Sequence, residues 1–184
     1  MTTVIEAILG RSSEPRLQAP APDPTTLDQV FACAARAPDH ALLRPWRYLV
    51  IEGDGLQRLG ELFASACGPE ATDKEKEKLL KAPLRAPMII VGIACHHSHP
   101  KVPAGEQDMS AAVGMGYILL ALQSLGFAGM WRTGAMASHP AVAEGLGLVS
   151  NETITGFLYV GSVSGAKPCV PRPEPTAFVA RWPG

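Results

Sequence analysis

The stretch Glu106–Gly134, EQDMSAAVGMGYILLALQSLGFAGMWRTG, decides how the rest of the chain can be arranged. It begins with charged and polar residues and continues with small and apolar residues up to Leu125. Because apolar residues fall on every side of the helix, this pattern predicts a helix over 106–126 that is buried all round. Gly126 is placed to end that helix, and residues 127–134 are predicted to form a short strand.

Two glycines, Gly114 and Gly116, lie inside this predicted helix. Glycine is less favourable than alanine in a helix by about 1 kcal/mol, so we expect another part of the protein to approach the helix backbone closely there. The following strand ends in Arg132, Thr133 and Gly134. Such residues suit an anionic ligand better than they suit a core.

Length and charge limit the class of protein. A chain of 184 residues is large enough for one domain with a substantial core, so we expect a single domain over 1–184. A formal net charge of −1 gives no electrostatic basis for binding nucleic acid or an anionic membrane. The four scattered cysteines indicate reduced thiols, and the N-terminal sequence lacks a signal-peptide pattern. We therefore expect a cytoplasmic protein in which 109–125 is a buried helix and not a membrane span.

The other elements follow from capping and periodicity signals. Capping boxes at Thr3–Glu6 and at Thr26–Gln29 predict where the first two helices begin. We predict further helices near 56–68, 73–81 and 138–146, the last capped by Ser138, and strands at 47–51, 88–94 and 153–163. The apolar strand 88–94 is expected to be buried on both faces. The proline-rich tail 167–184 keeps Phe178, Val179 and Trp182, so we expect it to dock onto another surface, such as a partner subunit.

Signatures of several chemistries are missing from the sequence. There is no GxxxxGK[ST] loop and no GxSxG elbow, and Gly114-Met115-Gly116 lies inside a helix without a third glycine. The run Cys95-His96-His97-Ser98-His99 lies in one loop and leaves a metal-binding module open as an alternative. The turn Arg11-Ser12-Ser13 fits either a solvated loop or a phosphate site. Cations and hydroxyls without an acid–base pair are typical of a protein whose cofactor performs the chemistry.

Four motifs occur together in the order of a known family. They are Arg11-Ser12-Ser13, Arg36-Ala37-Pro38-Asp39-His40 with Pro45-Trp46-Arg47, Lys101-Val102-Pro103 with Glu106-Gln107, and Gly129-Met130-Trp131-Arg132-Thr133-Gly134. Over essentially the full chain they resemble the nitroreductase superfamily, in particular its small NAD(P)H nitroreductases. The resemblance implies an α+β fold with a central, mostly antiparallel sheet surrounded by helices. It also implies a domain-exchanged homodimer with FMN bound at the subunit interface, helix 106–126 at the dimer axis and the tail reaching across to the partner.

The resemblance also implies a set of cofactor ligands. Arg11, Ser12 and Ser13 would bind the phosphate and ribityl chain of FMN, Trp131, Arg132 and Thr133 would complete that cradle, and Arg36 and His40 would come from the other subunit. No metal site is implied. No catalytic side chain is implied either, because solvent can provide the protons. The implied activity passes a hydride from NAD(P)H through flavin N5 to nitroaromatic, quinone-like or other electrophilic small molecules, by ping-pong kinetics. The alternative is a flavin-binding protein with little turnover, such as a carrier, a sensor or a flavin-consuming relative.

Two positions depart from the family pattern. Ser12 stands where many members carry a second arginine, and Leu43 and Arg44 stand where larger members have asparagine and glutamine. An arginine at position 44 is expected to narrow the acceptor pocket or to favour an anionic acceptor. The choice between NADH and NADPH cannot be read from the chain, since it has no Rossmann-type specificity residue.

Overall fold

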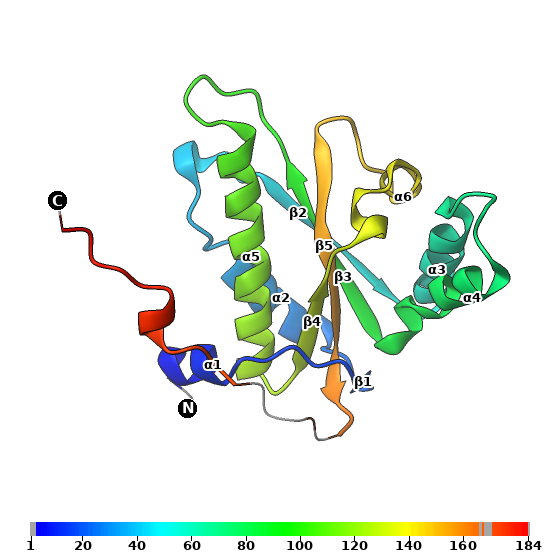
Figure 1. The fold of residues 1–184 in the computed structure, drawn as a ribbon, viewed down its shortest axis with the longest axis horizontal. Coiled ribbons are helices and arrows are strands. Elements are labelled where there is room, and N and C mark those ends of the chain that lie inside the picture. The colour runs from blue at the N-terminus through cyan, green and yellow to red at the C-terminus, as the bar shows by residue number, and fades with distance from the viewer. Residues whose placement is uncertain (1–2, 166, 168–170, 184) are drawn as a thin grey trace.

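The computed structural model describes residues 3–165, 167 and 171–183. A central antiparallel sheet lies between two layers of helices (Figure 1). Its strands are β1 (Leu17–Gln18), β2 (Trp46–Glu52), β3 (Met88–Cys95), β4 (Ala128–Arg132) and β5 (Glu152–Val163). The helices are α1 (Val4–Gly10), α2 (Pro24–Ala34), α3 (Asp54–Ala66), α4 (Asp73–Lys81), α5 (Ala104–Ser124) and α6 (Pro140–Gly145). This is the α+β fold that the resemblance implied.

The long strand β5 organises the sheet. On one side it pairs with β3, which in turn pairs with the edge strand β2. On its other side it pairs first with β4 and then, near its end, with β1. Every one of these pairings is antiparallel. Residues from distant parts of the chain therefore meet along β5, and the end of β4 is held beside its first half.

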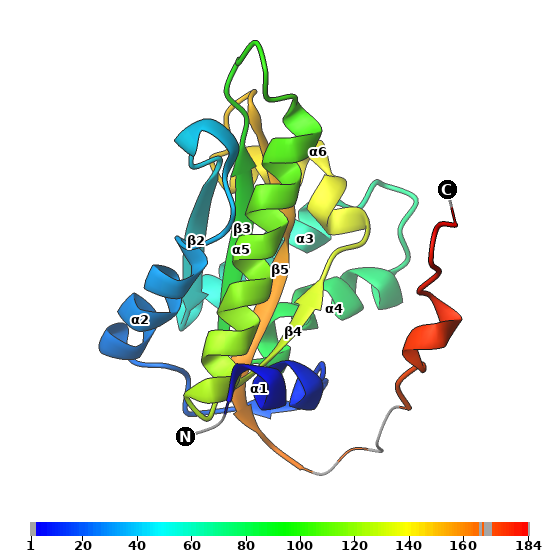
Figure 2. The ribbon, with the colours of Figure 1, turned by 90° about the vertical axis from the view of Figure 1, so that its left-hand side faces the viewer.

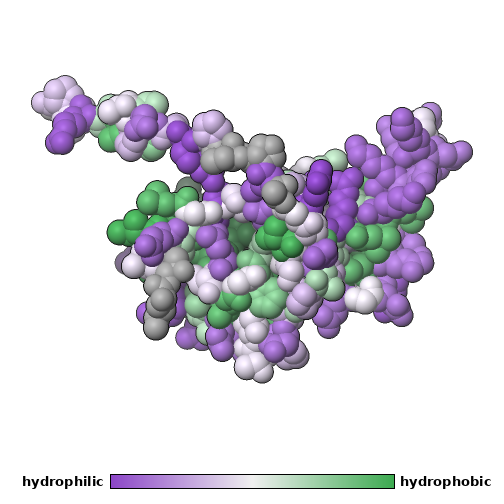
Figure 3. Space-filling model, turned by 90° about the horizontal axis from the view of Figure 1, so that it is seen from below, coloured by the Kyte–Doolittle hydropathy of each residue, from purple (hydrophilic) through white to green (hydrophobic). Residues whose placement is uncertain are grey.

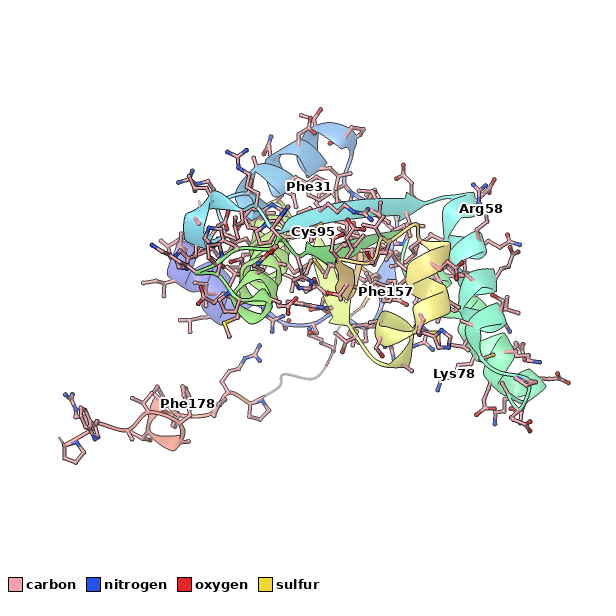
Figure 4. All side chains as sticks on the ribbon, turned by 90° about the horizontal axis from the view of Figure 1, so that it is seen from above. Phe31, Arg58, Lys78, Cys95, Phe157 and Phe178 are labelled. Atoms are coloured by element: carbon pink, nitrogen blue, oxygen red, sulfur yellow. The ribbon has the colours of Figure 1, made fainter. Side chains whose placement is uncertain are left out.

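Two hydrophobic cores cover the two faces of the sheet. Ile89 and Val91 of β3 belong to the core under α3 and α6, whereas Met88 and Ile90 belong to the core under α2 and α5. Figure 2 shows α2 and α5 in front of the sheet with α3 and α4 behind it. From above, Phe31 and Phe157 lie on opposite sides of the sheet (Figure 4). The prediction that β3 is buried on both faces is confirmed.

Helix α5 is buried on one side and open on the other. Ala111, Met115, Ile118 and Leu122 are buried against the sheet. Met109 and Val113 on the other side are 69% and 38% exposed. The prediction of a helix buried all round is therefore wrong for the single chain, because none of its described elements covers this face.

The two glycines of α5 differ in their surroundings. A Cβ atom at Gly114 would collide with the Tyr48 hydroxyl, so the predicted close approach exists there. A Cβ atom at Gly116 would meet no heavy atom within 4 Å, so the same prediction fails at that position. Gly116 instead lies on the open side of the helix, where no described side chain covers the helix backbone in a single chain.

Three helix starts were predicted from capping residues, and the structure confirms one of them. Thr3 and Glu6 form the capping box of α1. Helix α2 begins at Pro24 and not near Thr26, because Asp23 accepts a hydrogen bond from Thr26 N at 2.7 Å and proline fits the first helical position. Helix α6 is likewise capped by His139 and not by Ser138, whose hydroxyl donates to Ala135 O.

The N-terminal helix and the C-terminal tail expose apolar side chains on one side of the molecule. Val4 and Leu9 of α1 are 74% and 72% exposed, and Trp182 of the tail is 90% exposed. The tail runs away from the body in Figure 1, and Phe178 stands clear of it in Figure 4. Seen from below, apolar surface gathers on the side where α1 lies, whereas the outer end of the α3 and α4 side is mostly hydrophilic, with some apolar surface next to it (Figure 3). Within one chain the described part of the tail, 171–183, does not cover the apolar side chains of α1.

Two further findings concern the described residues. No helix among them combines the length and the apolarity needed to cross a membrane. Cys33, Cys67 and Cys95 are free thiols, and Cys169 lies outside the described residues.

Candidate functional site

A pocket of about 430 Å³ lies beside the middle of α5. It brings together the loop after α1, the open side of α5 and the end of β4. Its lining residues are Arg11, Ser13, Gly116, Leu119, Trp131 and Thr133. Four of the eight predicted cofactor ligands therefore meet in one pocket, although the pair Arg11 and Ser13 lies more than a hundred residues from the pair Trp131 and Thr133 in the sequence.

The loop after α1 is fixed to this place by hydrogen bonds at both of its ends. Gln123 of α5 donates from Nε2 to Ala7 O at 3.2 Å, which holds α1 against α5. Glu14 N donates to Gly129 O at 3.2 Å, which ties the loop to the start of β4. Arg11 and Ser13 are consequently held above Gly116 and Leu119.

Trp131 forms the wall of the pocket that is nearest to the sheet. Its indole packs against the core under α2 and α5, and its Nε1 donates to Thr155 O at 3.3 Å. A side chain at Gly156 would collide with the indole, so a glycine is needed there. The sheet thus makes room for a large aromatic ring at the edge of the pocket.

Arg132 lies on the other face of the sheet. Successive residues of a strand point to opposite faces, so Arg132 points away from Trp131 and Thr133. Its guanidinium carbon lies 5.3 Å from the centroid of the Tyr159 ring, and its buried Nε has no partner among the described residues. The structure therefore separates Arg132 from the pocket, and its assignment to the cofactor stays a prediction.

Ser12 contacts the tail instead of the pocket. Its hydroxyl donates to Glu14 Oε1 at 3.0 Å and accepts from Lys167 Nζ at 2.6 Å. Arg172 Nη2 donates to Arg11 O at 2.5 Å, so two cations of the tail meet the predicted phosphate-binding turn. Neither cation was singled out from the sequence. The available signal was a pair of cations in a tail whose apolar residues already indicated docking.

His40 lies at the other end of the open face of α5. Its Nδ1 is 2.9 Å from Glu106 Oε2, and both residues line a pocket of about 250 Å³ that also contains Met109 and Val113. Arg36 is exposed just beyond α2. In one chain, Arg36 and His40 are therefore not part of the pocket that contains Arg11.

The loop that carries His40 has an unusual backbone. Ala41, Leu42 and Arg44 have φ values of 64°, 55° and 50°, in the left-handed region that non-glycine residues rarely adopt. The Asp39 carboxylate stabilises this conformation by accepting hydrogen bonds from Leu43 N at 3.2 Å and from Arg44 N at 2.7 Å. Clusters of strained residues of this kind are typical of functional sites.

The histidines that suggested a metal site have separate partners. His96 Nε2 is 2.7 Å from Asp108 Oδ1, and His99 Nδ1 accepts from Lys101 N at 3.3 Å. The loop is anchored by the buried Gln107, which bonds to the backbone of His97 and Val102. Within 3–165, 167 and 171–183 no group of three or more metal-capable side chains is gathered.

A half-buried ion pair joins β2 to β5 near this loop. Arg47 of β2 donates to both carboxylate oxygens of Glu152 of β5, at 2.6 and 2.7 Å. The hydrogen bonds from Arg47 are the main reason that the pKa of Glu152 falls to about 2. Burial, with a smaller contribution from Glu152, raises the pKa of the Cys95 thiol to about 11. We assign this cluster a structural role, because a thiol with such a pKa is not a nucleophile at neutral pH.

Comparisons with known proteins show the family and the fold of the chain. The Nitroreductase family model matches residues 8–162. The Escherichia coli protein named "Putative NAD(P)H nitroreductase YdjA" is 38% identical over 178 residues, which cover 95% of this chain and 97% of that protein. A nitroreductase-like family protein from Bacillus cereus has the same fold, with a TM-score of 0.89, 22% identity and coverage of 100% and 98% of the two chains. A mutant of NfnB, described as an FMN and NADPH-dependent nitroreductase from sphigopyxis sp. strain HMH, has a TM-score of 0.79 at 17% identity, covering 99% of each chain. The chain described here belongs to the nitroreductase family.

Proposed function

We propose that this protein is an FMN-dependent oxidoreductase that uses NAD(P)H to reduce small electrophilic acceptors, such as nitroaromatic and quinone-like compounds. When bound, FMN would take a hydride from NAD(P)H at its N5 atom and pass it to the acceptor, in two half-reactions with ping-pong kinetics. The family and the name of the YdjA relative support the use of NAD(P)H, and the NfnB relative supports FMN. The scattered cysteines support a cytoplasmic location.

The residues of the pocket beside α5 fit an FMN molecule. Arg11, Ser13 and Thr133 supply a guanidinium and two hydroxyls, which are suitable donors for a phosphate and a ribityl chain. Trp131 and Leu119 supply an apolar wall, and the bare backbone at Gly116 allows close approach of a flat ring. The meeting of Arg11, Ser13, Trp131 and Thr133 in one pocket is the observation that carries the proposal.

A homodimer would complete the site. The apolar residues Met109 and Val113 lie on the same open face of α5 as Gly116, next to the pocket of His40. A second copy packed on this face would bury these side chains and bring its own Arg36 and His40 toward the pocket of Arg11. The exposed apolar side chains of the tail support an exchange in which each tail docks on the partner.

The visible absorption spectrum of the purified protein tests this proposal. Apoprotein reconstituted with FMN should show a flavin spectrum that bleaches when NADH or NADPH is added under anaerobic conditions. It should recover when an acceptor such as a quinone is added. A flavin spectrum that neither nicotinamide bleaches would favour the flavin-binding protein with little turnover. A protein that does not retain FMN would refute both readings.

A further inference from the structure

The Glu14 carboxylate occupies two donors at the predicted phosphate-binding turn. Its Oε1 accepts a hydrogen bond from Ser12 Oγ at 3.0 Å and makes an ion pair with Lys167 Nζ. Both partners of the ion pair are largely buried, with side-chain exposures of 14% for Glu14 and 24% for Lys167. A carboxylate therefore contacts both a hydroxyl and an ammonium group, which are the kinds of donor that a phosphate requires.

The ammonium group of Lys167 is fully engaged in this arrangement. Besides Glu14, it donates to Ser12 Oγ and to Ser13 O, both at 2.6 Å. An ammonium group has three hydrogens to donate, so these three contacts use all of them. An incoming anion can bind Lys167 only by taking the place of one of these acceptors, and the carboxylate is the acceptor of like charge.

The backbone keeps Glu14 close to the turn. Glu14 N is bonded to Gly129 O, and the segment that follows enters the sheet, where Leu17 pairs with Val163 of β5. The carboxylate can rotate away, but the residue cannot leave. A phosphate bound at Ser12 and Lys167 must either displace the carboxylate or lie beside a second negative charge, and both alternatives cost binding free energy.

We propose that Glu14 is an internal anion that competes with the phosphate of FMN for Ser12 and Lys167. It thereby lowers the preference of the site for FMN over riboflavin, which has the same ring and ribityl chain but no phosphate. This inference rests on the proposed function, because it takes the flavin phosphate to bind at the turn Arg11-Ser12-Ser13. It assigns a specificity-determining role to a residue that none of the motifs contains.

Flavin titrations of the apoprotein test the proposal. The dissociation constants of FMN and riboflavin would be measured by fluorescence quenching for the wild type, for Glu14→Gln and for Glu70→Gln. Glutamine keeps the acceptor for Ser12 but removes the charge. Glu70→Gln is the control, because it makes the same change in net charge at an exposed residue outside the turn. Glu14→Gln should bind FMN about tenfold more tightly while riboflavin changes less than about twofold, since a charge-assisted contact to phosphate is released. Glu70→Gln should behave like the wild type.

A double variant identifies the donor that Glu14→Gln makes available to the phosphate. If Lys167 is the group that Glu14 occupies, the gain for FMN should be lost when Glu14→Gln is combined with Lys167→Gln. An unchanged FMN affinity in Glu14→Gln would overturn the proposal, and so would an equal gain for riboflavin. Weaker FMN binding would also overturn it, because Glu14 would then be an organiser of the turn and not a competitor.

Inorganic phosphate gives a readout that does not depend on flavin. Millimolar phosphate should raise the Tm of Glu14→Gln apoprotein more than that of the wild type, and equal shifts would contradict the competition. If neither protein binds any flavin, the proposed function fails, and the phosphate titration still decides whether Glu14 blocks an anion site.

Discussion

The indole of Trp131 fills the space that a side chain at position 156 would occupy. The indole reaches past its register partner Leu158 to position 156 of the neighbouring strand β5, and its Nε1 donates to the carbonyl of the residue before Gly156, Thr155. A wall of the proposed flavin pocket thus depends on the absence of a side chain in another strand. This relationship is invisible in either segment alone.

Gly156→Ala should displace the Trp131 indole and weaken FMN binding. We expect a loss of stability of about 1–3 kcal/mol, as for other overpacked sites, and a changed near-ultraviolet circular dichroism spectrum of the apoprotein. Gly147→Ala is the matched control, because Gly147 also has a positive φ, of 73° against 153° at Gly156, and a Cβ there meets nothing within 4 Å. Combining Gly156→Ala with Trp131→Leu should restore part of the lost stability. Equal effects of Gly156→Ala with and without the indole would contradict the relationship.

Arg11→Ala should weaken FMN binding by about tenfold to a hundredfold, since a hydrogen bond to a charged group contributes about 1.5–3 kcal/mol. Arg58→Ala is the control, because this substitution removes the same charge from a residue that lines a separate pocket beside α3. Isothermal titration calorimetry of the two apoprotein variants measures the difference. If both substitutions weaken FMN equally, the pocket beside α5 is not the phosphate site.

The Arg47–Glu152 pair should make the free energy of unfolding decrease as the pH is lowered. The folded-state pKa of Glu152 is about 2, below its ordinary value of 4.5, so the pair stabilises the protein above pH 4.5. This contribution is lost as the pH falls from 4.5 toward 2. Glu152→Gln should cost about 2 kcal/mol at pH 7 and less at pH 3, because at pH 3 the Glu152 carboxylate of the unfolded wild type takes up a proton while the folded one, with its pKa of about 2, stays mostly ionised. Urea unfolding at both values measures this, and a constant difference would refute it.

Val113→Glu should disrupt the proposed dimer. The side chain lies on the open face of α5, so a carboxylate there would be buried against the second copy without a partner. Light scattering after size exclusion should show a folded monomer with weakened FMN binding. Leu84→Glu is the control, since Leu84 is exposed at 56% in the turn that follows α4. A wild-type monomer that binds FMN tightly would refute the shared site.

Local signals in the sequence predicted the elements well where the cause of structure is local. The capping box of α1 and the apolar runs of β3 and α5 lie where the pattern put them, because hydrogen bonding and burial act there within a few residues. The start of α2 was misplaced because Asp23 and Pro24 form a stronger start signal than Thr26.

The candidate site was predictable only in part. The motifs gave Arg11, Ser13, Trp131 and Thr133, but strand alternation separates Arg132 from them, and no motif indicates that separation. The contacts of Glu14 with Lys167 depend on how the tail returns to the first loop, which is a long-range property of the fold. The strained backbone at Ala41 and Leu42 was also unpredictable, since neither residue type favours a positive φ.

The distance between the pockets of Arg11 and His40 along α5 has a consequence for mixed assemblies. If each catalytic centre borrows His40 from one copy and Arg11 from the other, a dimer of an Arg11→Ala chain with a His40→Ala chain contains one centre with both defects and one with neither. Two variants that are inactive alone should then recover activity when they are unfolded and refolded together. Conversely, one substituted chain in a dimer impairs a centre to which its unsubstituted partner also contributes. The activity of a mixed population would therefore depend on how the chains pair, and not only on the fraction of unsubstituted chains.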